Sequence, residues 1–437
     1  MKIGLINPAW GDRRRGVNAT ALYRSIPPQS LLQLASLTPL DHEVSITDEN
    51  WSTLDVTYPY DLVGITGTTV QIPRAYAIAD EFRKRGVPVV MGGPHVSFLP
   101  HEAAMHADSI VRWEADEIWE RVLKDAENHR LEKVYNPKFP QSLDFKVVRP
   151  MSRTFQIETP SWVPVKIKAA AIQAQRGCPH NCEFCSVTKF NGRRVRHKSV
   201  GYLIDEIKNA MKENIRFLLF MDDNIVADKE YAKELFHALI PLHIQWLSQT
   251  DIGIADDDVL DLAVKSGMKL ALIGFESTDA ETLGASISAA KKSWRAKYED
   301  GLSKLRHRGV MVHGGFILGL DGHTHDQAMK TVEWAIENKL TVSHFTLSTP
   351  LPGTGLFRRL DKAGRIDTYD WSKYMVTECC VVKGGEGYKE ALEATQRTAY
   401  REFYRFGSLL RRFNPRLSPL NQLLWLMMQS LSGMGAS

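Results

Sequence analysis

The stretch Gly177-Cys178-Pro179-His180-Asn181-Cys182-Glu183-Phe184-Cys185 decides how this sequence is interpreted. Its three thiols follow the spacing C-x3-C-x2-C, directly after an apolar run that predicts a strand at 169–175. Three thiolates can hold three irons of a [4Fe-4S] cluster, which leaves the fourth iron open to an exogenous ligand. A structural zinc site would need a fourth Cys or His, and His180 lies at an unsuitable separation for that role. The spacing therefore favours an iron-sulfur cluster with one open iron.

The composition is that of an ordinary folded protein with several domains. Of 437 residues, 43% are hydrophobic and 24% are charged, which excludes disordered, collagen-like and coiled-coil chains. A domain takes about 100–200 residues, so this length predicts two or three domains. The net charge of +4 is too small to indicate nucleic acid as a partner.

The five cysteines divide into the three of the loop and an adjacent pair, Cys379 and Cys380. An odd number in a long chain is unlike the disulfide framework of a small secreted protein. Adjacent cysteines rarely reach one metal, so we interpret the pair as structural, with radical quenching or a further metal site as the alternative. The run 1–8 is too short for a signal peptide, and the apolar run 423–428 is far shorter than the roughly 20 residues of a membrane span. We therefore expect a cytoplasmic protein in a reducing compartment.

Residues 1–134 are predicted to form an α/β domain with a Rossmann-like, doubly wound parallel sheet. Short apolar runs alternate there with helical periodicity at 28–38 and 72–85. The predicted strands are 2–7, 43–48, 62–66, 88–92 and 109–112. Sheets of this kind bind ligands at the carboxyl ends of their strands. The absence of G-x-G-x-x-G argues against a nicotinamide site.

A proline-rich linker is predicted at 135–168, and a second α/β domain at 169–361. Its six predicted strands are 169–175, 217–221, 245–250, 268–274, 310–318 and 344–348. Six βα units are fewer than the eight of a closed barrel, so we predict an open, partial (β/α)6 TIM-like barrel. Residues 362–437 are predicted to be a small helical C-terminal region whose default role is to pack on the barrel.

The cysteine loop, with Phe184 before its last cysteine and six βα units after it, resembles the radical S-adenosylmethionine superfamily. The resemblance implies that Cys178, Cys182 and Cys185 hold a [4Fe-4S] cluster whose open iron is chelated by the methionine end of S-adenosylmethionine. It also implies that an electron from the cluster cleaves this cofactor to give a 5′-deoxyadenosyl radical. The protein's part in such chemistry is to position the cofactors and to exclude water.

Four later segments match strand-end motifs of that family in the expected order. They are Phe220–Asn224, Gly274–Ser277, Gly314–Leu320 and Thr349–Thr354. Each alone has a structural explanation, because carboxylates cap helices and glycines mark close packing. Together with the loop, they imply a cofactor-binding role for Phe184, Asp222, Asp223, Asn224, Gly274, Glu276, Gly315 and Thr349.

The first domain resembles the cobalamin-binding domain that precedes many radical S-adenosylmethionine enzymes. The resemblance rests on Leu62–Thr69, Met91–His95 and Val111–Glu117. The cofactor contacts it implies are Asn7, Pro8, Thr66, Gly67, Thr68, Thr69, Gly92, Gly93, Pro94, His95 and Glu114. Adjacent glycines remove side chains where a strand end must approach a bulky tail, and threonine hydroxyls can bond corrin amides.

The first domain departs from the family pattern at two places. No D-x-H-x-x-G follows the first strand, so we expect the lower face of cobalt to lack a His from that motif. His95 is interpreted as a hydrogen-bond partner of the cofactor's tail or phosphate rather than as a cobalt ligand. Trp113 stands where members often have Gly, which puts a large ring into a tight turn.

The two resemblances together imply a cobalamin-dependent radical S-adenosylmethionine enzyme, and we expect a C-methyltransferase that acts on an unactivated carbon through methylcobalamin. One alternative is a related enzyme that catalyses oxidative cyclisation, ring contraction or rearrangement, and another is a cobalamin-binding sensor or scaffold. The expected partners are a small-molecule substrate, with hydrophobic molecules among the candidates, and a reductant such as flavodoxin or ferredoxin. The basic run Arg193–Lys198 is interpreted either as meeting an anionic substrate or an electron donor such as flavodoxin, or as a solvated charged face.

Overall fold

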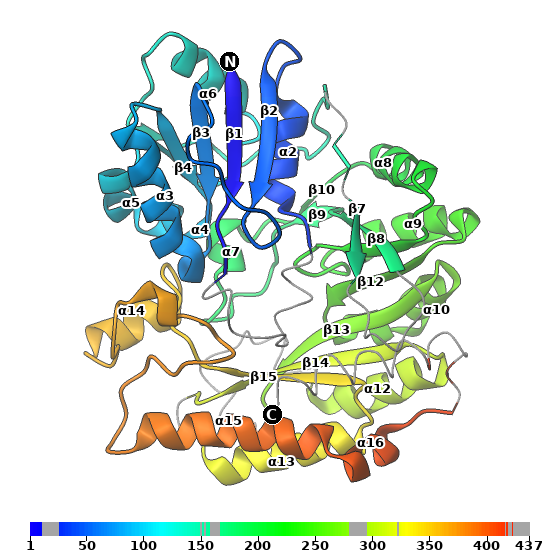
Figure 1. The fold of residues 1–437 in the computed structure, drawn as a ribbon. Helices are drawn as coiled ribbons and strands as arrows, with labels where there is room; N and C mark the ends of the chain where they lie inside the picture. The colour runs from blue at the N-terminus through cyan, green and yellow to red at the C-terminus, as the bar shows by residue number, and fades with distance from the viewer. Residues whose placement is uncertain are drawn as a thin grey trace.

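Two sheets lie next to each other in the computed structural model, and the N-terminal strands point their carboxyl ends toward the second sheet (Figure 1). The structure describes residues 1–10, 26–148, 151–152, 154–157, 167–278, 295–320, 323–415, 417 and 422. The tail run 423–428 and parts of the predicted linker lie outside these residues. The predicted α/β class is confirmed.

The N-terminal sheet has six parallel strands in the order β2-β1-β3-β4-β5-β6. Its strands are β1 (Lys2–Asn7), β2 (Glu43–Asp48), β3 (Leu62–Thr66), β4 (Val89–Gly92), β5 (Ser109–Val111) and β6 (Val134–Tyr135). The first five were predicted. Strand β6 was missed because two residues carry no readable periodicity.

Helices cover both faces of this sheet, as a doubly wound fold requires. They are α2 (Gln29–Leu37), α3 (Ile72–Lys84), α4 (Pro94–Phe98), α5 (Pro100–His106) and α6 (Trp119–Glu127). One apolar cluster joins Phe82 of α3 to Val63 of the sheet, and another joins Leu31 of α2 and Trp119 of α6 to Leu5. Because both faces are buried, the strands read in the sequence as continuous apolar runs.

The second sheet has seven strands in the order β15-β14-β13-β12-β11-β8-β7. The six parallel ones are β8 (Ile167–Ile172), β11 (Phe217–Phe220), β12 (Gln245–Thr250), β13 (Met268–Glu276), β14 (Met311–Leu318) and β15 (Val342–Leu347). They form the open, partial barrel that was predicted. Strand β7 (Thr154–Ile157) pairs antiparallel with β8 inside the stretch predicted as a linker. The prolines around it hid this strand, since proline is confined to edges and strand starts.

Helices on the outside of the barrel and a short hairpin at its mouth complete the second domain. The outer helices are α8 (Val200–Lys212), α9 (Lys229–Leu239), α10 (Asp257–Lys265), α12 (Tyr298–His307) and α13 (His325–Glu337), whereas the short α7 (Val187–Phe190) follows the cysteine loop at the mouth. The hairpin pairs β9 (Gln175–Arg176) with β10 (Arg196–His197), and the cysteine loop lies between these two strands.

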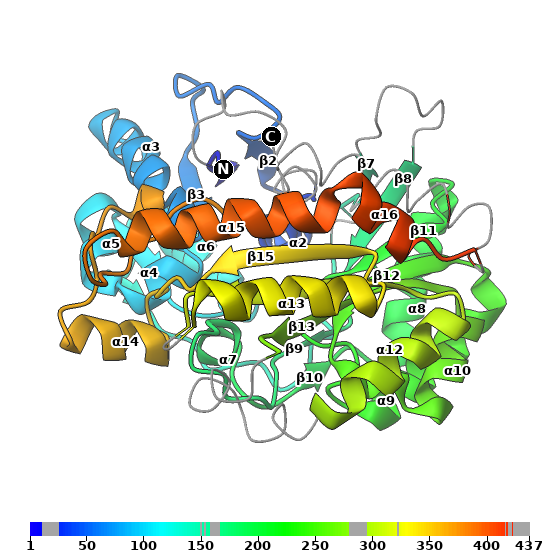
Figure 2. The ribbon, with the colours of Figure 1, turned by 90° about the horizontal axis from the view of Figure 1, so that it is seen from below.

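Helix α15 (Tyr388–Tyr404) closes the free edge of the second sheet, where it runs alongside β15, and α16 (Phe406–Arg412) follows it (Figure 2). Helix α14 (Gly355–Lys362), earlier in the chain, packs against the cysteine loop instead. The hydroxyls of Tyr400 and Tyr404 accept hydrogen bonds from the backbone N–H groups of Phe345 and Ser343 on β15. An unpaired edge strand offers its backbone to other chains, so these side chains protect the barrel edge.

The cysteine pair lies in the loop between α14 and α15 rather than in a helix. Cys380 belongs to the hydrophobic core of the barrel, and burial raises the pKa of its thiol. This setting supports the structural interpretation of Cys380.

Candidate functional site

The cysteine loop begins at a position that only glycine fits. Gly177 has a φ of +96°, and a Cβ there would overlap the carbonyl oxygen of Arg194. Its backbone N–H donates to Asp223 Oδ2 at 3.1 Å, at the end of β11. The chain therefore enters the loop in a fixed direction, held by the neighbouring strand.

The three cysteines line one cavity of about 310 Å³ at the barrel mouth. Burial raises the pKa of the Cys185 thiol to about 12, so its thiolate forms when a cation displaces the proton. Among the described residues, no three His, Cys, Asp or Glu side chains converge as a single metal ion would require. Three thiols spread around one cavity fit a cluster rather than a zinc ion.

Helix α14 holds the loop from its other side. Arg359 Nε donates to Glu183 Oε1 at 2.8 Å, and the backbone N–H of Leu356 donates to the carbonyl of Glu183 at 3.1 Å. Glu183 lies between the second and third cysteines, so the part of the loop that carries both thiols is anchored on the C-terminal region.

The three residues Asp222, Asp223 and Asn224 have two different roles. Asp223 and Asn224 line the cavity, as a cofactor-binding role requires. Asp222 instead accepts hydrogen bonds from the backbone N–H groups of Ala174 (3.2 Å) and Gln175 (2.5 Å). Burial raises the pKa of Asp222 to about 7. Asp222 therefore shapes the start of the cysteine loop from behind.

Three predicted residues of β13 and β14 also line this cavity, as Phe184 of the cysteine loop does. Glu276 lines the cavity at the end of β13. Its φ is +67°, and it lies next to a bulge in the pairing of β13 with β14. Such strain in a residue other than glycine clusters at functional sites. Gly274 and Gly315 lie beside it and leave the wall without side chains. Thr349 is buried, and its hydroxyl donates to the carbonyl of Leu347 rather than facing this cavity.

A second cavity, of about 320 Å³, lies at the carboxyl ends of the N-terminal strands and reaches the barrel. The predicted contacts that line it are Thr66, Gly92, Gly93, Pro94 and Glu114. Gly93 has a φ of +100°, and a Cβ there would lie 2.8 Å from Thr66 Oγ1. These glycines form a cradle that a bulky, largely apolar group can enter, so the residues present fit the tail of cobalamin.

The other predicted contacts of the first domain lie behind this cavity wall. Gln71 Nε2 donates to Asn7 Oδ1 and to the carbonyl of Pro8, and Thr68 caps the same turn. His95 is fully buried, with ring nitrogens 3.3 Å from Thr69 Oγ1 and 3.3 Å from Glu102 Oε1. Neither His95 nor Asn7, Pro8, Gly67, Thr68 or Thr69 is among the described residues that line the cavity. The interpretation of His95 as a hydrogen-bond partner of the cofactor's tail or phosphate stays a prediction, because its ring nitrogens face Thr69 and Glu102 in this structure.

Trp113 occupies its tight turn in the left-handed region, with a φ of +62°. Its ring lines the cavity of the first domain and contacts three rings from different segments. The ring centroids lie 5.8 Å from Phe98, 6.2 Å from Phe139 and 6.2 Å from Phe190. Phe190 ends α7, directly after the cysteine loop, so the Trp that replaces glycine joins the two domains through aromatic packing.

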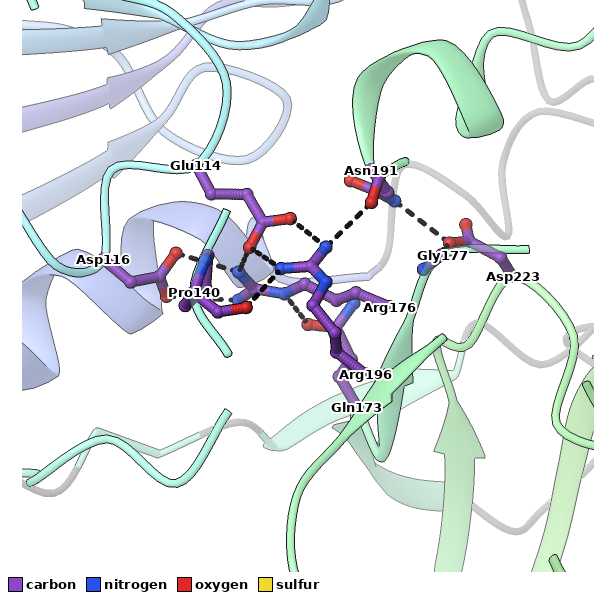
Figure 3. Close-up of polar contacts among 9 residues, drawn as sticks. All are labelled: Glu114, Asp116, Pro140, Gln173, Arg176, Gly177, Asn191, Arg196 and Asp223. Atoms are coloured by element: carbon purple, nitrogen blue, oxygen red, sulfur yellow. Dashed lines mark hydrogen bonds and ion pairs between the residues drawn. The ribbon is translucent and has the colours of Figure 1, made fainter. Parts of the chain in front are cut away.

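Buried ion pairs connect the domains beside this aromatic cluster (Figure 3). Arg176 Nη1 lies 2.8 Å from Asp116 Oδ2 and 2.9 Å from Glu114 Oε2. Arg196 Nη2 lies 2.5 Å from Glu114 Oε1, and side-chain exposure is only 3% for Arg196 and 4% for Glu114. The solvated-face interpretation of Arg193–Lys198 is wrong for Arg196 and Lys198, which are buried.

A chain of hydrogen bonds continues from this network to the cysteine loop (Figure 3). Arg196 Nη2 donates to the carbonyl of Asn191 at 2.8 Å, and Asn191 Nδ2 donates to Asp223 Oδ2 at 3.0 Å. Asn191 lines the first-domain cavity and Asp223 lines the cysteine cavity. The two cavities therefore share a wall. Sequence reasoning missed Arg176 and Asn191, although the position of Arg176 directly before Gly177-Cys178 was a usable signal.

Comparison with known proteins agrees with both halves of the site. Residues 172–335 match the radical SAM superfamily, and residues 16–123 match the B12 binding domain. The fold superposes on the radical S-adenosylmethionine methyltransferase TsrM from Kitasatospora setae with a TM-score of 0.66 at 16% identity, covering 84% of this chain and 79% of that one. The fold and site thus define a radical S-adenosylmethionine enzyme with a cobalamin domain.

The relatives narrow this class to a family. The chain is 31% identical over 401 residues to a bacteriochlorophyllide d C-8(2)-methyltransferase of Chlorobaculum tepidum, covering 88% of this chain and 87% of that protein. A C-12(1)-methyltransferase from the same organism is 28% identical, covering 90% and 86%. The chain belongs to the cobalamin-dependent radical S-adenosylmethionine methyltransferases, which confirms the expected enzyme class and its three cofactors. When bound, the cluster and S-adenosylmethionine supply hydrogen abstraction, and cobalamin supplies the methyl group that is placed on carbon.

Proposed function

We propose that this enzyme methylates a saturated carbon on the periphery of a tetrapyrrole. Support comes from the two relatives named above, which are bacteriochlorophyllide d methyltransferases and match this chain over most of its length. Such a substrate is large and mostly apolar, in keeping with the hydrophobic class expected from the sequence. No described helix is both long and apolar enough to cross a membrane.

The observation that carries the proposal is the wall shared by the two cavities. A methyl donor and a radical source must meet at one substrate carbon, and a displacement of about 1 Å can cost a hundredfold in rate. The Asn191–Asp223 hydrogen bond of 3.0 Å ties the wall of one cavity to that of the other. We propose that this bond keeps the cofactors of the two domains in register.

We propose the following division of work among the site residues. Cys178, Cys182 and Cys185 bind the cluster, and Asp223 and Asn224 face the amino end of S-adenosylmethionine. Glu276 bonds its ribose or methionine part, with Gly315 beneath the adenine. Thr66, Gly92 and Gly93 form the cradle for the cobalamin tail. We propose that the domain that holds them spans residues 1–134.

We propose that a flavodoxin- or ferredoxin-like reductant docks next to the cysteine loop, in the cytoplasm. Arg193 and Arg194 remain exposed there, and Arg193 Nη2 donates to the carbonyl of Pro179 within the loop. Two exposed cations on the cluster loop suit the acidic surface of such a donor.

Transfer of an isotopic label tests the proposed function. The reconstituted holoenzyme is incubated without oxygen with bacteriochlorophyllide d and S-adenosylmethionine carrying a deuterated methyl group. Methyl transfer predicts a product that gains one labelled methyl group. A product without label contradicts methyl transfer and favours the cyclisation or rearrangement alternative. No product at all contradicts bacteriochlorophyllide d as the substrate.

A further inference from the structure

Two histidines face each other on the barrel wall across from the cysteine loop. His313 on β14 and His344 on β15 line the same cavity as the three cysteines. Strands β14 and β15 lie at the opposite end of the sheet order from β8, whose loop carries the cysteines. His313 Nε2 lies 3.1 Å from His344 Nδ1, and the ring planes are nearly perpendicular at 81°.

The strand register turns both rings into the cavity. Gly315 is directly opposite His344, and His313 is opposite Val342, so the histidines form a diagonal pair on one face of the sheet. Because Gly315 has no side chain, the cavity stays open beside the His344 ring.

The positions of the ring hydrogens decide which hydrogen-bond donors and acceptors the two histidines present to the cavity. In a neutral pair, one ring donates its inner N–H, and its outer nitrogen therefore carries a lone pair. The other ring accepts at its inner nitrogen, and its outer nitrogen therefore carries a hydrogen. The outer nitrogens are His313 Nδ1 and His344 Nε2, and neither has a hydrogen-bond partner among the residues that the structure describes. When both rings change tautomer together, so that the outer proton moves to the outer nitrogen of the other ring as the inner proton crosses, the two roles are exchanged with no change in charge. The pair can therefore present either a donor or an acceptor at each end.

Both rings are neutral in the folded protein. Burial lowers the pKa of His344 to about 4, and burial together with the neighbouring ring lowers the pKa of His313 far below its usual value. Placing two polar rings in a barrel interior is costly unless their nitrogens find partners, and an apolar pair would avoid this cost. The fold alone gives no reason for this pair.

We propose that the His313–His344 pair is a substrate subsite that hydrogen-bonds an uncharged oxygen-bearing group, a carbonyl or a hydroxyl. The pair accepts from a hydroxyl or donates to a carbonyl without any change in its net charge. The inference rests on the proposed function in taking the cavity to hold a substrate beside the cofactor. The adenine of S-adenosylmethionine also carries a donor next to an acceptor and could bond the same pair. The test must therefore distinguish binding of the substrate from binding of S-adenosylmethionine.

The test uses full-length holoenzyme and variants that differ in hydrogen bonding but not in bulk. His313→Phe and His344→Phe remove the outer polar atoms, whereas His313→Gln and His344→Gln keep a donor and an acceptor. His307→Phe, on the exposed face of α12, is the matched control. The probe is the small-molecule extract of cells that lack this protein, in which its substrate accumulates. Two quantities are measured: stimulation of 5′-deoxyadenosine formation by the extract, and the Kd for S-adenosylmethionine.

We expect the Phe variants to need about tenfold more extract for half-maximal stimulation, as the loss of one net hydrogen bond predicts. Their Kd for S-adenosylmethionine should stay within about twofold of the wild-type value, and the Gln variants should recover most of the stimulation. Wild-type stimulation in the Phe variants overturns the proposal, and so does a parallel loss of affinity for S-adenosylmethionine. Stimulation of the wild-type enzyme without a methylated product contradicts the proposed function but leaves the histidine result valid, because stimulation reports binding whatever product forms. A wild-type enzyme that the extract does not stimulate contradicts both.

Discussion

Arg176 Nη1 lies 2.8 Å from Asp116 Oδ2, and this contact joins the cobalamin domain to a residue two positions before the first cluster cysteine. Glu114 completes the arrangement by pairing with Arg176 and Arg196 together. Two buried carboxylates, Glu114 and Asp116, therefore balance two guanidinium groups, and the first prediction removes one of these charges.

Glu114→Gln should destabilise the enzyme by about 3 kcal/mol, because removing one partner of a buried ion pair leaves uncompensated charge. Chemical denaturation of the full-length protein gives the free energy of unfolding. The control is Glu120→Gln in the same domain, where the pair with Lys124 is fully exposed and its loss should barely change the free energy of unfolding. Equal effects of the two substitutions would contradict the role given to Glu114.

Cys182→Ala should abolish cluster binding and reduce 5′-deoxyadenosine formation to background, because two thiolates cannot hold three irons. Iron and sulfide content after anaerobic reconstitution, together with product analysis, measures both effects. Cys380→Ala is the matched control, since Cys380 is also buried but lies in the barrel core. Retention of S-adenosylmethionine cleavage by Cys182→Ala would overturn the radical mechanism.

Trp113→Ala and Trp113→Gly separate backbone strain from ring packing. Both lose the aromatic contacts with Phe98, Phe139 and Phe190, at a cost of about 2 kcal/mol. Glycine adopts the φ of +62° without strain, so Trp113→Gly should be about 1 kcal/mol more stable than Trp113→Ala. Trp51→Ala, at a residue with 56% exposure, controls for loss of a surface ring. Equal stabilities of the Gly and Ala variants would contradict the strained backbone at this turn.

The histidine pair should make stability fall in mild acid. A histidine whose pKa is lowered by folding binds a proton more readily in the unfolded chain, so unfolding becomes easier as pH falls below about 6.5. With His344 at a pKa of about 4, the loss between pH 6.5 and pH 5.5 is about 1 kcal/mol for that residue. The measurement is the free energy of unfolding at both pH values for the wild-type protein and for His344→Gln. On going from pH 6.5 to pH 5.5, the free energy of unfolding of the wild-type protein should fall relative to that of His344→Gln by that amount. An unchanged difference between the two proteins would contradict a buried, neutral His344 ring.

The sequence predicts most of this architecture because its strands are apolar runs separated by helical periodicity. Strands β1, β2 and β3 have the predicted bounds. Strand β7 could not be found, because four residues among prolines carry no pattern that distinguishes a strand from a linker. The three loop cysteines could be singled out because their spacing is local, and the structure places them around one cavity, while their role as cluster ligands stays a prediction. Arg176 and Glu114 are 62 residues apart and His313 and His344 are 31 apart, so only the fold brings these partners together.

The placement of Trp113 bears on how such enzymes can be recombined. Its ring contacts the first domain, the connecting segment at Phe139 and the helix after the cluster loop at Phe190. A chimera that takes its cobalamin module from one parent and its barrel from another would have to transplant this junction as a unit. The proline-rich connector is therefore a poor crossover point, because a chimera joined there would separate the Trp113 ring from the aromatic residues that it contacts.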